Sequence, residues 1–96
     1  MKFEWDEDKR KSNFRKHKLD FPRASMVFRD KKRVELIDDR KDYGETRIQV
    51  IGKIRKLIFV YSVIVFVVYT NRTGIHRIIS ARPANKNEKG IYYDNR

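Results

Sequence analysis

Residues 77–82 read Arg-Ile-Ile-Ser-Ala-Arg, and residues 85–88 read Asn-Lys-Asn-Glu directly behind them. The first run mixes isoleucine with cationic and polar side chains, which predicts a strand over 75–82 that packs a core and also presents guanidinium groups. Pro83 ends this strand, because proline has no backbone N–H to donate. An asparagine with a glutamate three residues later is typical of a capping box, so we expect a short last helix. Arginines held on a strand suit phosphate oxygens and indicate RNA or DNA chemistry.

The charge of the chain supports that interpretation. Its 96 residues predict one domain, 1–96, with one modest core. Lys and Arg number 24 against 13 Asp and Glu, a net charge of +11, and residues 51–96 contain nine basic but only two acidic side chains. Such a field favours polyanions and binding that weakens with salt. The alternative is a basic surface that only keeps the protein in solution.

Cysteine and histidine usage limits the metal chemistry. The chain has no cysteine and only two histidines, His17 and His76. Disulfides and thiolate metal sites are therefore excluded, and a conventional zinc site is not expected. We expect no metal and no cofactor. The residues after Met1 have no apolar signal-peptide core, and a cysteine-free chain suits a reducing compartment, so we expect a cytoplasmic protein.

Local patterns predict the other elements. Asp6 and Asp20 are placed to cap two N-terminal helices, of which the first has acidic residues in its first turn and basic residues in its last. Lys18 stands where a glycine would commonly close the first helix. The expected fold class is α+β, a small mostly antiparallel sheet with two N-terminal helices and a short C-terminal helix. Strands are expected at 2–5, 33–38, 47–54, 57–69 and 75–82.

Residues 57–69 form an unusually apolar run in which only Ser62 is clearly polar. The run is shorter than the roughly 20 residues of a membrane-spanning helix, and its valines and isoleucines favour a strand. A straight strand of that length would be too long for a small domain, so we expect a bend near Tyr61-Ser62. Three interpretations remain open: a strand buried on both faces, an edge that pairs with another chain, and a membrane segment.

Several blocks of the sequence, taken in order, resemble the BrnT toxins of bacterial type II toxin–antitoxin systems. They cover nearly the whole chain, and it is their combination that is specific. One departure is Lys18, where the family usually has glycine. The matching blocks are Phe3-Glu4-Trp5-Asp6, Asn13 with Lys16-His17, Phe21, Ala24, Val27-Phe28, Asp38-Asp39-Arg40, Asp42-Tyr43-Gly44-Glu45, Arg47, Val68-Tyr69-Thr70, Arg72, Arg77 to Arg82, Ala84, Glu88 and Tyr92.

The resemblance implies a small RelE-like fold and a ribonuclease that blocks translation. It also implies a cognate antitoxin of the ribbon-helix-helix type, similar to BrnA, that forms a hetero-oligomer with the toxin and neutralises it. Operator DNA would then be bound only through the antitoxin, and no membrane is involved.

RNA can be cut without metal when a base takes the proton of the 2′-hydroxyl, an acid protonates the leaving oxygen and cations stabilise the phosphate. Arg77 and Arg82 are the candidate cations, and the alternative for each is a structural ion pair, with Glu88 or with the acidic loop. Being five residues apart on one strand, they point to opposite faces unless a bulge intervenes.

Proton transfer and RNA contact are assigned to further residues. His17 has a reference pKa of about 6.5, which suits proton transfer at neutral pH, although it could equally cap the first helix. Glu45 is the candidate base in a loop that could instead be an ion-paired turn, and Tyr92 could stack on a base or anchor the last helix. The residues expected to contact RNA are Lys16, Arg47, Arg72 and Tyr92.

Three functions fit these patterns. The first is a metal-independent endoribonuclease toxin that inhibits translation. The second is a nucleic-acid-binding module in which the same arginines hold phosphates without catalysis. The third is an interaction subunit that binds a partner through its basic face and its long apolar strand. We favour the first because of the resemblance; composition and spacing alone indicate a small basic α+β domain.

Overall fold

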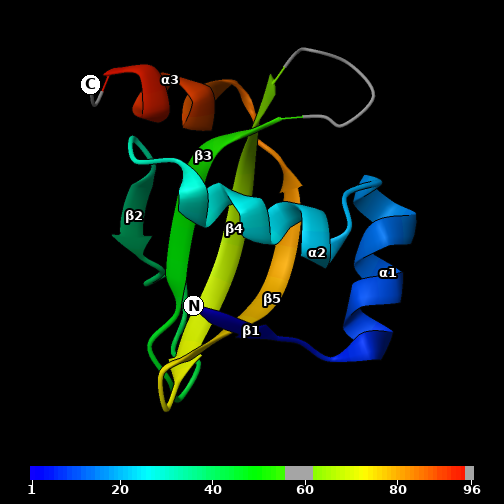
Figure 1. Cartoon of the computed structure of the whole chain (residues 1–96). Helices are drawn as coiled ribbons and strands as arrows, with labels where there is room; N and C mark the ends of the chain where they lie inside the picture. The colour runs from blue at the N-terminus through cyan, green and yellow to red at the C-terminus, as the bar shows by residue number, and fades with distance from the viewer. Residues whose placement is uncertain (56–61, 95–96) are drawn as a thin grey trace.

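The computed structural model describes residues 1–55 and 62–94 and has an α+β fold (Figure 1). Five strands form one sheet in the order β1-β5-β4-β3-β2. The order of elements along the chain is the expected one. The bounds are β1 Lys2–Glu4, α1 Glu7–His17, α2 Phe21–Ala24, the 3-10 helix η1 Ser25–Arg29, β2 Val34–Ile37, β3 Ile48–Arg55, β4 Ser62–Arg72, β5 Ile75–Pro83 and α3 Lys86–Asp94.

The sheet is mixed, which corrects the expectation of a mostly antiparallel one. Strands β2 to β5 pair antiparallel with their neighbours, but β1 runs parallel to β5, with Phe3 opposite His76. Of the strands in the sheet, β1 and β5 lie furthest apart in the sequence. The local alternation of Phe3 and Trp5 predicts a strand but contains no information about its partner.

The expectation of two N-terminal helices is also met only in part. After four residues, α2 tightens into η1, a 3-10 helix. Val27 of η1 approaches the backbone of β3 so closely that a Cβ on Gly52 would lie 2.6 Å from Val27 Cγ2. The tightened turns therefore pack against a strand whose glycine leaves the room for them.

The first helix has the ends that the sequence predicts. The Asp6 side chain accepts hydrogen bonds from the backbone N–H groups of Asp8 and Lys9. Lys18 closes the helix in the left-handed conformation, at φ 58°, with its N–H donating to the Phe14 carbonyl. Here a lysine adopts the backbone conformation that most often belongs to glycine.

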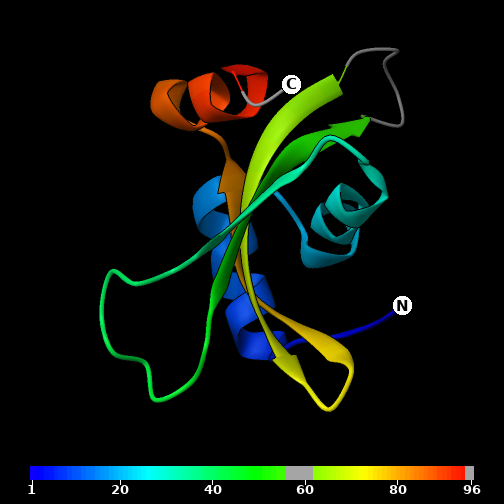
Figure 2. The ribbon, with the colours of Figure 1, turned by 90° about the vertical axis from the view of Figure 1, so that its left-hand side faces the viewer.

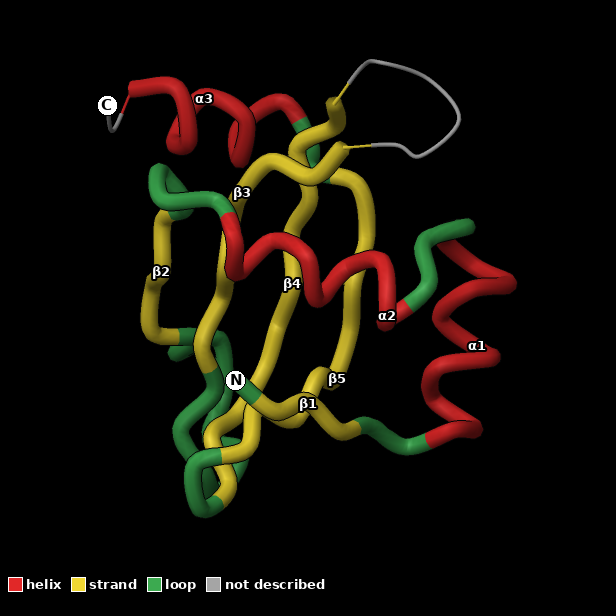
Figure 3. The backbone as a smooth tube through the Cα atoms, viewed as in Figure 1, coloured by secondary structure: helices red, strands yellow, loops and turns green. Residues whose placement is uncertain are grey.

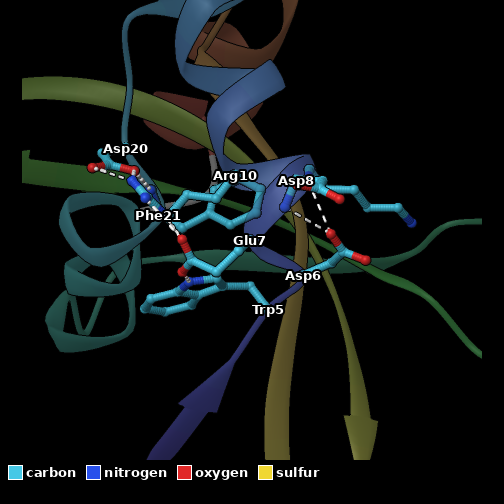
Figure 4. A network of polar contacts seen from close by, with 8 residues as sticks. Trp5, Asp6, Glu7, Asp8, Arg10, Asp20 and Phe21 are labelled. Carbon is cyan, nitrogen blue, oxygen red and sulfur yellow. Dashed lines mark hydrogen bonds and ion pairs between the residues drawn. The ribbon is translucent and has the colours of Figure 1, made fainter.

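Arg10 joins the starts of α1 and α2 (Figure 4). Its guanidinium donates to Glu7 at 2.8 Å and to Asp20 at 3.1 Å, and Glu7 also accepts from the Trp5 indole N–H at 2.9 Å. The Trp5 ring meets Phe21 edge to face. This network fixes the direction in which α1 leaves β1 and returns to α2.

Helices cover both faces of the sheet. In Figure 2, α2 lies on one side, and α3 lies on the other together with the 38–47 loop, which Figure 3 draws as the long connection between β2 and β3. Each covered face has its own apolar core. The core under α2 contains Leu19, Phe21, Ala24, Val27, Phe28, Val50, Ile54, Val65, Val67, Tyr69, Ile78 and Ala81. The core under α3 contains Val34, Ile51, Ile64, Phe66, Val68, Ala84 and Tyr92.

The apolar run supplies the central strand. Residues 64–69 are buried, with alternate side chains in the two cores, which confirms a strand buried on both faces for this part. Residues 57–61, which include Tyr61 of the expected bend, lie outside the described residues. No helix in the described part of the chain is both long and apolar enough to cross a membrane.

Strand β5 is held at its outer edge by a side chain of α1. Beyond the three residues paired with β1, Asn13 Nδ2 donates to the Ala81 carbonyl at 2.7 Å, and the Ala81 N–H donates to Asn13 Oδ1 at 3.2 Å. The amide therefore replaces a neighbouring strand at this point. Asn13 also donates to the Leu19 carbonyl at 3.2 Å, so it fixes α1, the start of α2 and β5 relative to one another.

Asn13→Ala is expected to lower the free energy of unfolding by about 2–4 kcal/mol, because it leaves a buried N–H and two carbonyls without partners. Urea denaturation followed by circular dichroism measures the change. Ser12→Ala, at the exposed neighbouring position, is the control and should stay within about 0.5 kcal/mol of the parent. A similarly small effect of Asn13→Ala would mean that the edge of β5 does not depend on this amide.

Candidate active site

A bulge in β5 decides where the two candidate arginines lie. Val68 of β4 pairs with Ser80 and Tyr69 pairs with Ile78, so Ile79 is an extra residue between them. Beyond the bulge Arg82 is opposite Phe66, and before it Arg77 is opposite Thr70. These partners are four residues apart on one strand and therefore share a face. Arg77 and Arg82 consequently lie on the same face, the one on which α3 packs.

We call this side of the sheet the arginine face. On this face, Arg77 of β5 is opposite Thr70 of β4. Arg82 of β5 is opposite Phe66 of β4, and Phe66 is in turn opposite Ile51 of β3. Strand alternation adds Arg47, directly before β3, and Arg72, at the end of β4. Arg40 reaches the same face from the 38–47 loop, because its guanidinium carbon is 5.8 Å from the Phe66 ring centroid. The face is defined by Arg40, Arg47, Arg72, Arg77 and Arg82.

Arg82 is the most constrained of these side chains. Its Nη1 and Nη2 donate to the two carboxylate oxygens of Glu88 at 2.8 and 2.7 Å, Nη1 also donates to the Pro83 carbonyl at 3.3 Å, and its guanidinium carbon is 4.3 Å from the Phe66 ring centroid. Within the described residues, the Nε–H and one Nη2–H have no acceptor. These two donors form the edge with which arginine binds phosphate through paired hydrogen bonds.

Glu88 has two functions in this arrangement. It completes the predicted capping box, accepting from the Asn85 N–H at 2.9 Å while its own N–H donates to Asn85 Oδ1 at 2.8 Å. Burial alone would raise the pKa of Glu88, but hydrogen bonds from Arg82 and from the Asn85 N–H hold that pKa below its usual value. The carboxylate that starts α3 is therefore a charged partner that orients Arg82.

Asp38 gives Arg40 a similar partner. The Asp38 side chain is fully buried and accepts from Nε and Nη2 of Arg40, both at 2.8 Å, and from the Gln49 amide at 3.2 Å. The Arg40 guanidinium lowers the pKa of Asp38 to about 2, against the opposing effect of burial. A buried carboxylate thus holds a half-exposed arginine beside Phe66 and Arg82.

The remaining arginines have carboxylate partners too. Arg77 forms a close ion pair with Glu4 of β1. Glu45 accepts from Arg47 at 3.3 Å and from Arg72 at 3.1 Å, and the Arg47 guanidinium carbon lies 4.0 Å from the Tyr43 ring centroid. Ion pairs therefore organise the 38–47 loop, the structural role that the sequence left open.

Burial alone would raise the pKa of Glu45, yet the hydrogen bonds from Arg47 and Arg72 together hold that pKa below its usual value. A carboxylate with a low pKa is a weak proton acceptor, which reduces its suitability as a general base. Its position between two cations instead suits it to fixing Arg47 and Arg72.

Two candidates, Lys16 and His17, lie at the end of α1. His17 is four residues after Asn13 and therefore shares the side of α1 that meets β5. Lys16 is exposed. Within residues 1–55 and 62–94, neither side chain has a hydrogen bond or an ion pair. His17 does not cap the helix with its side chain in this arrangement.

Tyr92 has the contacts of an anchor. It is 2% exposed, and its hydroxyl donates to Asp30 Oδ2 at 2.6 Å. Asp30 also accepts from the Lys53 N–H at 2.8 Å. The Tyr92 side chain therefore fixes α3 to β3 and to the end of η1. A base could not stack on this ring without displacing the helix.

His76 lies on the opposite face of the sheet. Its ring stacks on Tyr69 at 4.7 Å between centroids and meets Phe3 and Phe28 edge to face. Burial lowers the pKa of His76. Because this ring packs in the core under α2, it cannot serve the arginine face, and His17 is the only other histidine.

The arrangement can neutralise and orient a phosphodiester. Five guanidinium groups share one face with four carboxylates, and the phenyl ring of Phe66 supports two of the cations. In the described residues, no three Asp, Glu or His side chains come together as a metal site would require.

The family comparison agrees with this chemistry. Residues 5–88 match the model of the ribonuclease toxin BrnT of type II toxin–antitoxin systems. The chain belongs to the BrnT toxin family. Membership makes RNA the substrate class and an antitoxin the partner class. No curated protein sequence matches the chain. The residues matched to BrnT include both arginines of β5, Glu88 and the whole 38–47 loop.

Sequence reasoning missed three features of this site. It considered Arg40 only as one residue of a possible site loop or ion-paired turn, it did not assign Asp38 a role, and it placed Phe66 only in an apolar run. A buried aspartate two residues from an arginine is a signal for an oriented cation, but it requires knowledge that Asp38 is buried. The stacking of Arg82 on Phe66 depends on the β4–β5 register, which a sequence does not reveal.

The buried pair of Asp38 and Arg40 predicts a pH dependence. The pKa of Asp38 falls from 3.8 to about 2 on folding, so its contribution to stability is present above about pH 4 and is lost as pH falls through about 2. Between about pH 5 and pH 2 the free energy of unfolding should fall by about 1–2 kcal/mol more in the parent than in Asp38→Asn. Urea denaturation at a series of pH values measures this, and parallel curves would contradict it.

Proposed function

We propose that the chain is a RelE-like, metal-independent endoribonuclease whose active site is the arginine face. The observation that carries the proposal is the bulge at Ile79, which brings Arg77 and Arg82 to one face. Without the bulge, the two cations would lie on opposite sides of the sheet and could not act on one substrate. The family membership supplies the substrate class, RNA.

In the proposed reaction, the 2′-oxygen attacks the adjacent phosphorus and the bond from phosphorus to the 5′-oxygen breaks. One proton passes from the 2′-hydroxyl to a base, and another passes from an acid to the 5′-oxygen. Arg82 offers the scissile phosphate its free Nε and Nη2 edge while remaining bound to Glu88. Arg77 contributes a second cation once phosphate competes with Glu4 for it.

His17 is the proposed proton-transfer group. It shares the side of α1 that meets β5, and an imidazole can act as acid or base near neutral pH. Glu45 is retained as the alternative base, although Arg47 and Arg72 already engage it. Lys16, Arg47 and Arg72 are the proposed phosphate contacts beside the site. Tyr92, which anchors α3, is not included among them.

The cellular part of the proposal follows from the family. Cleavage of RNA by this toxin would inhibit translation in the cytoplasm. The antitoxin would be a BrnA-like ribbon-helix-helix protein that covers the basic toxin, forms a hetero-oligomer with it and represses their operon. A net charge of +11 favours an antitoxin segment that is acidic where it meets the arginine face.

Cleavage of end-labelled RNA by the purified chain in excess EDTA tests the activity. We expect the parent to cut, and Arg77→Ala and Arg82→Ala to lower kcat by about 100-fold or more, because a cation that stabilises the transition state is lost. Arg29→Ala, an exposed arginine of η1 on the α2 side, is the matched control and should keep the parent rate.

Circular dichroism and urea midpoints should show that all three variants fold. Binding without cleavage by the parent would overturn the enzyme in favour of the passive nucleic-acid-binding module. That alternative has one observation in its favour, namely that Arg77 and Arg82 are each paired with a carboxylate.

The pH–rate profile tests His17. With His17 as the proton-transfer group, kcat should change with pH around neutrality, and His17→Asn should lower kcat about 100-fold and remove that dependence. Glu45→Gln should retain it. A neutral-range dependence that survives in His17→Asn would assign proton transfer to another group.

A further inference from the structure

We propose that the outer surface of α1 is a second binding site, which holds single-stranded RNA by stacking a base on Phe14 between cationic side chains. The site consists of Lys11, Phe14, Arg15 and Lys18, and we call it the α1 surface. It rests on the proposed function in one respect, because its ligand is a segment of the same RNA that reaches the arginine face. None of its residues belongs to that face.

The spacing of the four residues places them together. Lys11 is three residues before Phe14, so its side chain flanks the ring on the helix surface, and Lys18, which closes the helix, donates its N–H to the Phe14 carbonyl. Arg15 is four residues after Lys11 and extends the cationic side. Asn13 and His17 point to the other side, toward β5. The α1 surface is therefore the part of the helix that turns away from the sheet.

Phe14 is the exposed apolar residue of the α1 surface. It is 44% exposed, on a helix whose only buried residue is Asn13. One exposed apolar side chain is common and needs no explanation. A phenyl ring surrounded by cations is different, because this combination is what proteins use to bind single-stranded nucleic acid: the ring stacks on a base and the cations follow the phosphates.

The cations of the α1 surface differ from those of the arginine face in forming no close ion pair with a carboxylate. In the described parts of the chain, Lys11, Arg15 and Lys18 form no ion pair or side-chain hydrogen bond, whereas Arg40, Arg47, Arg72, Arg77 and Arg82 all do. Residues 9–18 contain six Lys or Arg and no Asp or Glu. Phosphates can therefore bind here without displacing a carboxylate.

The position of α1 suits an extension of the active site. The helix lies beside the outer edge of β5, to which Asn13 is hydrogen-bonded at Ala81, the neighbour of Arg82 (Figure 1). An RNA strand that crosses this edge from the arginine face meets α1 next. The two surfaces would then hold neighbouring segments of one strand, with the bond to be cut at the arginine face.

A binding experiment with an RNA analogue that cannot be cut tests this site alone. The probe is a fluorescein-labelled oligonucleotide of about 12 residues whose 2′-hydroxyls are methylated, so that no attacking group is present. Fluorescence anisotropy gives Kd for the full chain at several salt concentrations. Phe14→Leu should raise Kd about tenfold, because leucine keeps the apolar volume but cannot stack, and Phe14→Trp should restore binding.

Charge variants give a second measure. Lys11→Gln and Arg15→Gln should each reduce the slope of log Kd against log salt by about 0.7, the value for one phosphate contact on a single strand. Lys31→Gln is the matched control: it removes the same charge from an exposed position in the turn before β2 and should leave the slope unchanged. Circular dichroism and urea midpoints of every variant should match the parent.

The outcomes separate this site from the proposed catalysis. Parent-like binding by Phe14→Leu, or equal weakening by Lys31→Gln and Lys11→Gln, would overturn the α1 surface even if cleavage in EDTA is observed. Dependence of binding on Phe14 would support it even if the parent cuts no RNA, in which case the enzyme proposal falls. Loss of antitoxin affinity in Phe14→Leu with unchanged RNA binding would overturn it in favour of a protein-binding surface.

Discussion

The fastening of β5 is the constraint on which the rest of the structure depends. This strand pairs with β4 along its length, is bordered by β1 at its start and is held by the Asn13 amide at Ala81. The bulge at Ile79 lies between these two supports. A strand with an extra residue twists and bends locally, and it keeps a defined register only if both flanks are fixed. The edge contacts of β5 therefore stabilise the geometry that aligns Arg77 with Arg82.

Carboxylates make a highly basic face compatible with a folded chain. Five guanidinium groups on one face would repel one another, yet Asp38, Glu4, Glu45 and Glu88 lie among them. Because these acids are paired with the guanidinium groups, they also restrict the rotamers of the arginines. In the proposed active site, these acids would thereby preorganise the cations for the phosphates of RNA.

Local patterns predicted much of the fold. The caps at Asp6 and Asn85 and the strand buried on both faces depend on neighbouring residues, so they could be inferred from the sequence. The parallel β1–β5 pair depends on residues more than seventy positions apart. The change from α2 to η1 depends on the space beside Gly52. For the site, sequence alternation identified Arg77 and Arg82 and placed them on opposite faces unless a bulge intervened. It could not decide between the two cases, because a bulge leaves no reliable local signature when the extra residue is an isoleucine among isoleucines.

The partners of Arg82 link the stability of α3 to the geometry of the site. Glu88 caps the helix through Asn85 and binds Arg82 through both oxygens, while Tyr92, one turn further along, fastens the same helix to Asp30. Loss of the cap between Asn85 and Glu88, or of the hydrogen bond from Tyr92 to Asp30, would release the Glu88 carboxylate that orients Arg82. Phe66 of β4 also contacts the Arg82 guanidinium, so two independent elements, α3 and β4, orient the free Nε and Nη2 edge of Arg82. A short last helix, weakened by Gly90, therefore keeps in a single orientation the arginine that we propose contacts the scissile phosphate.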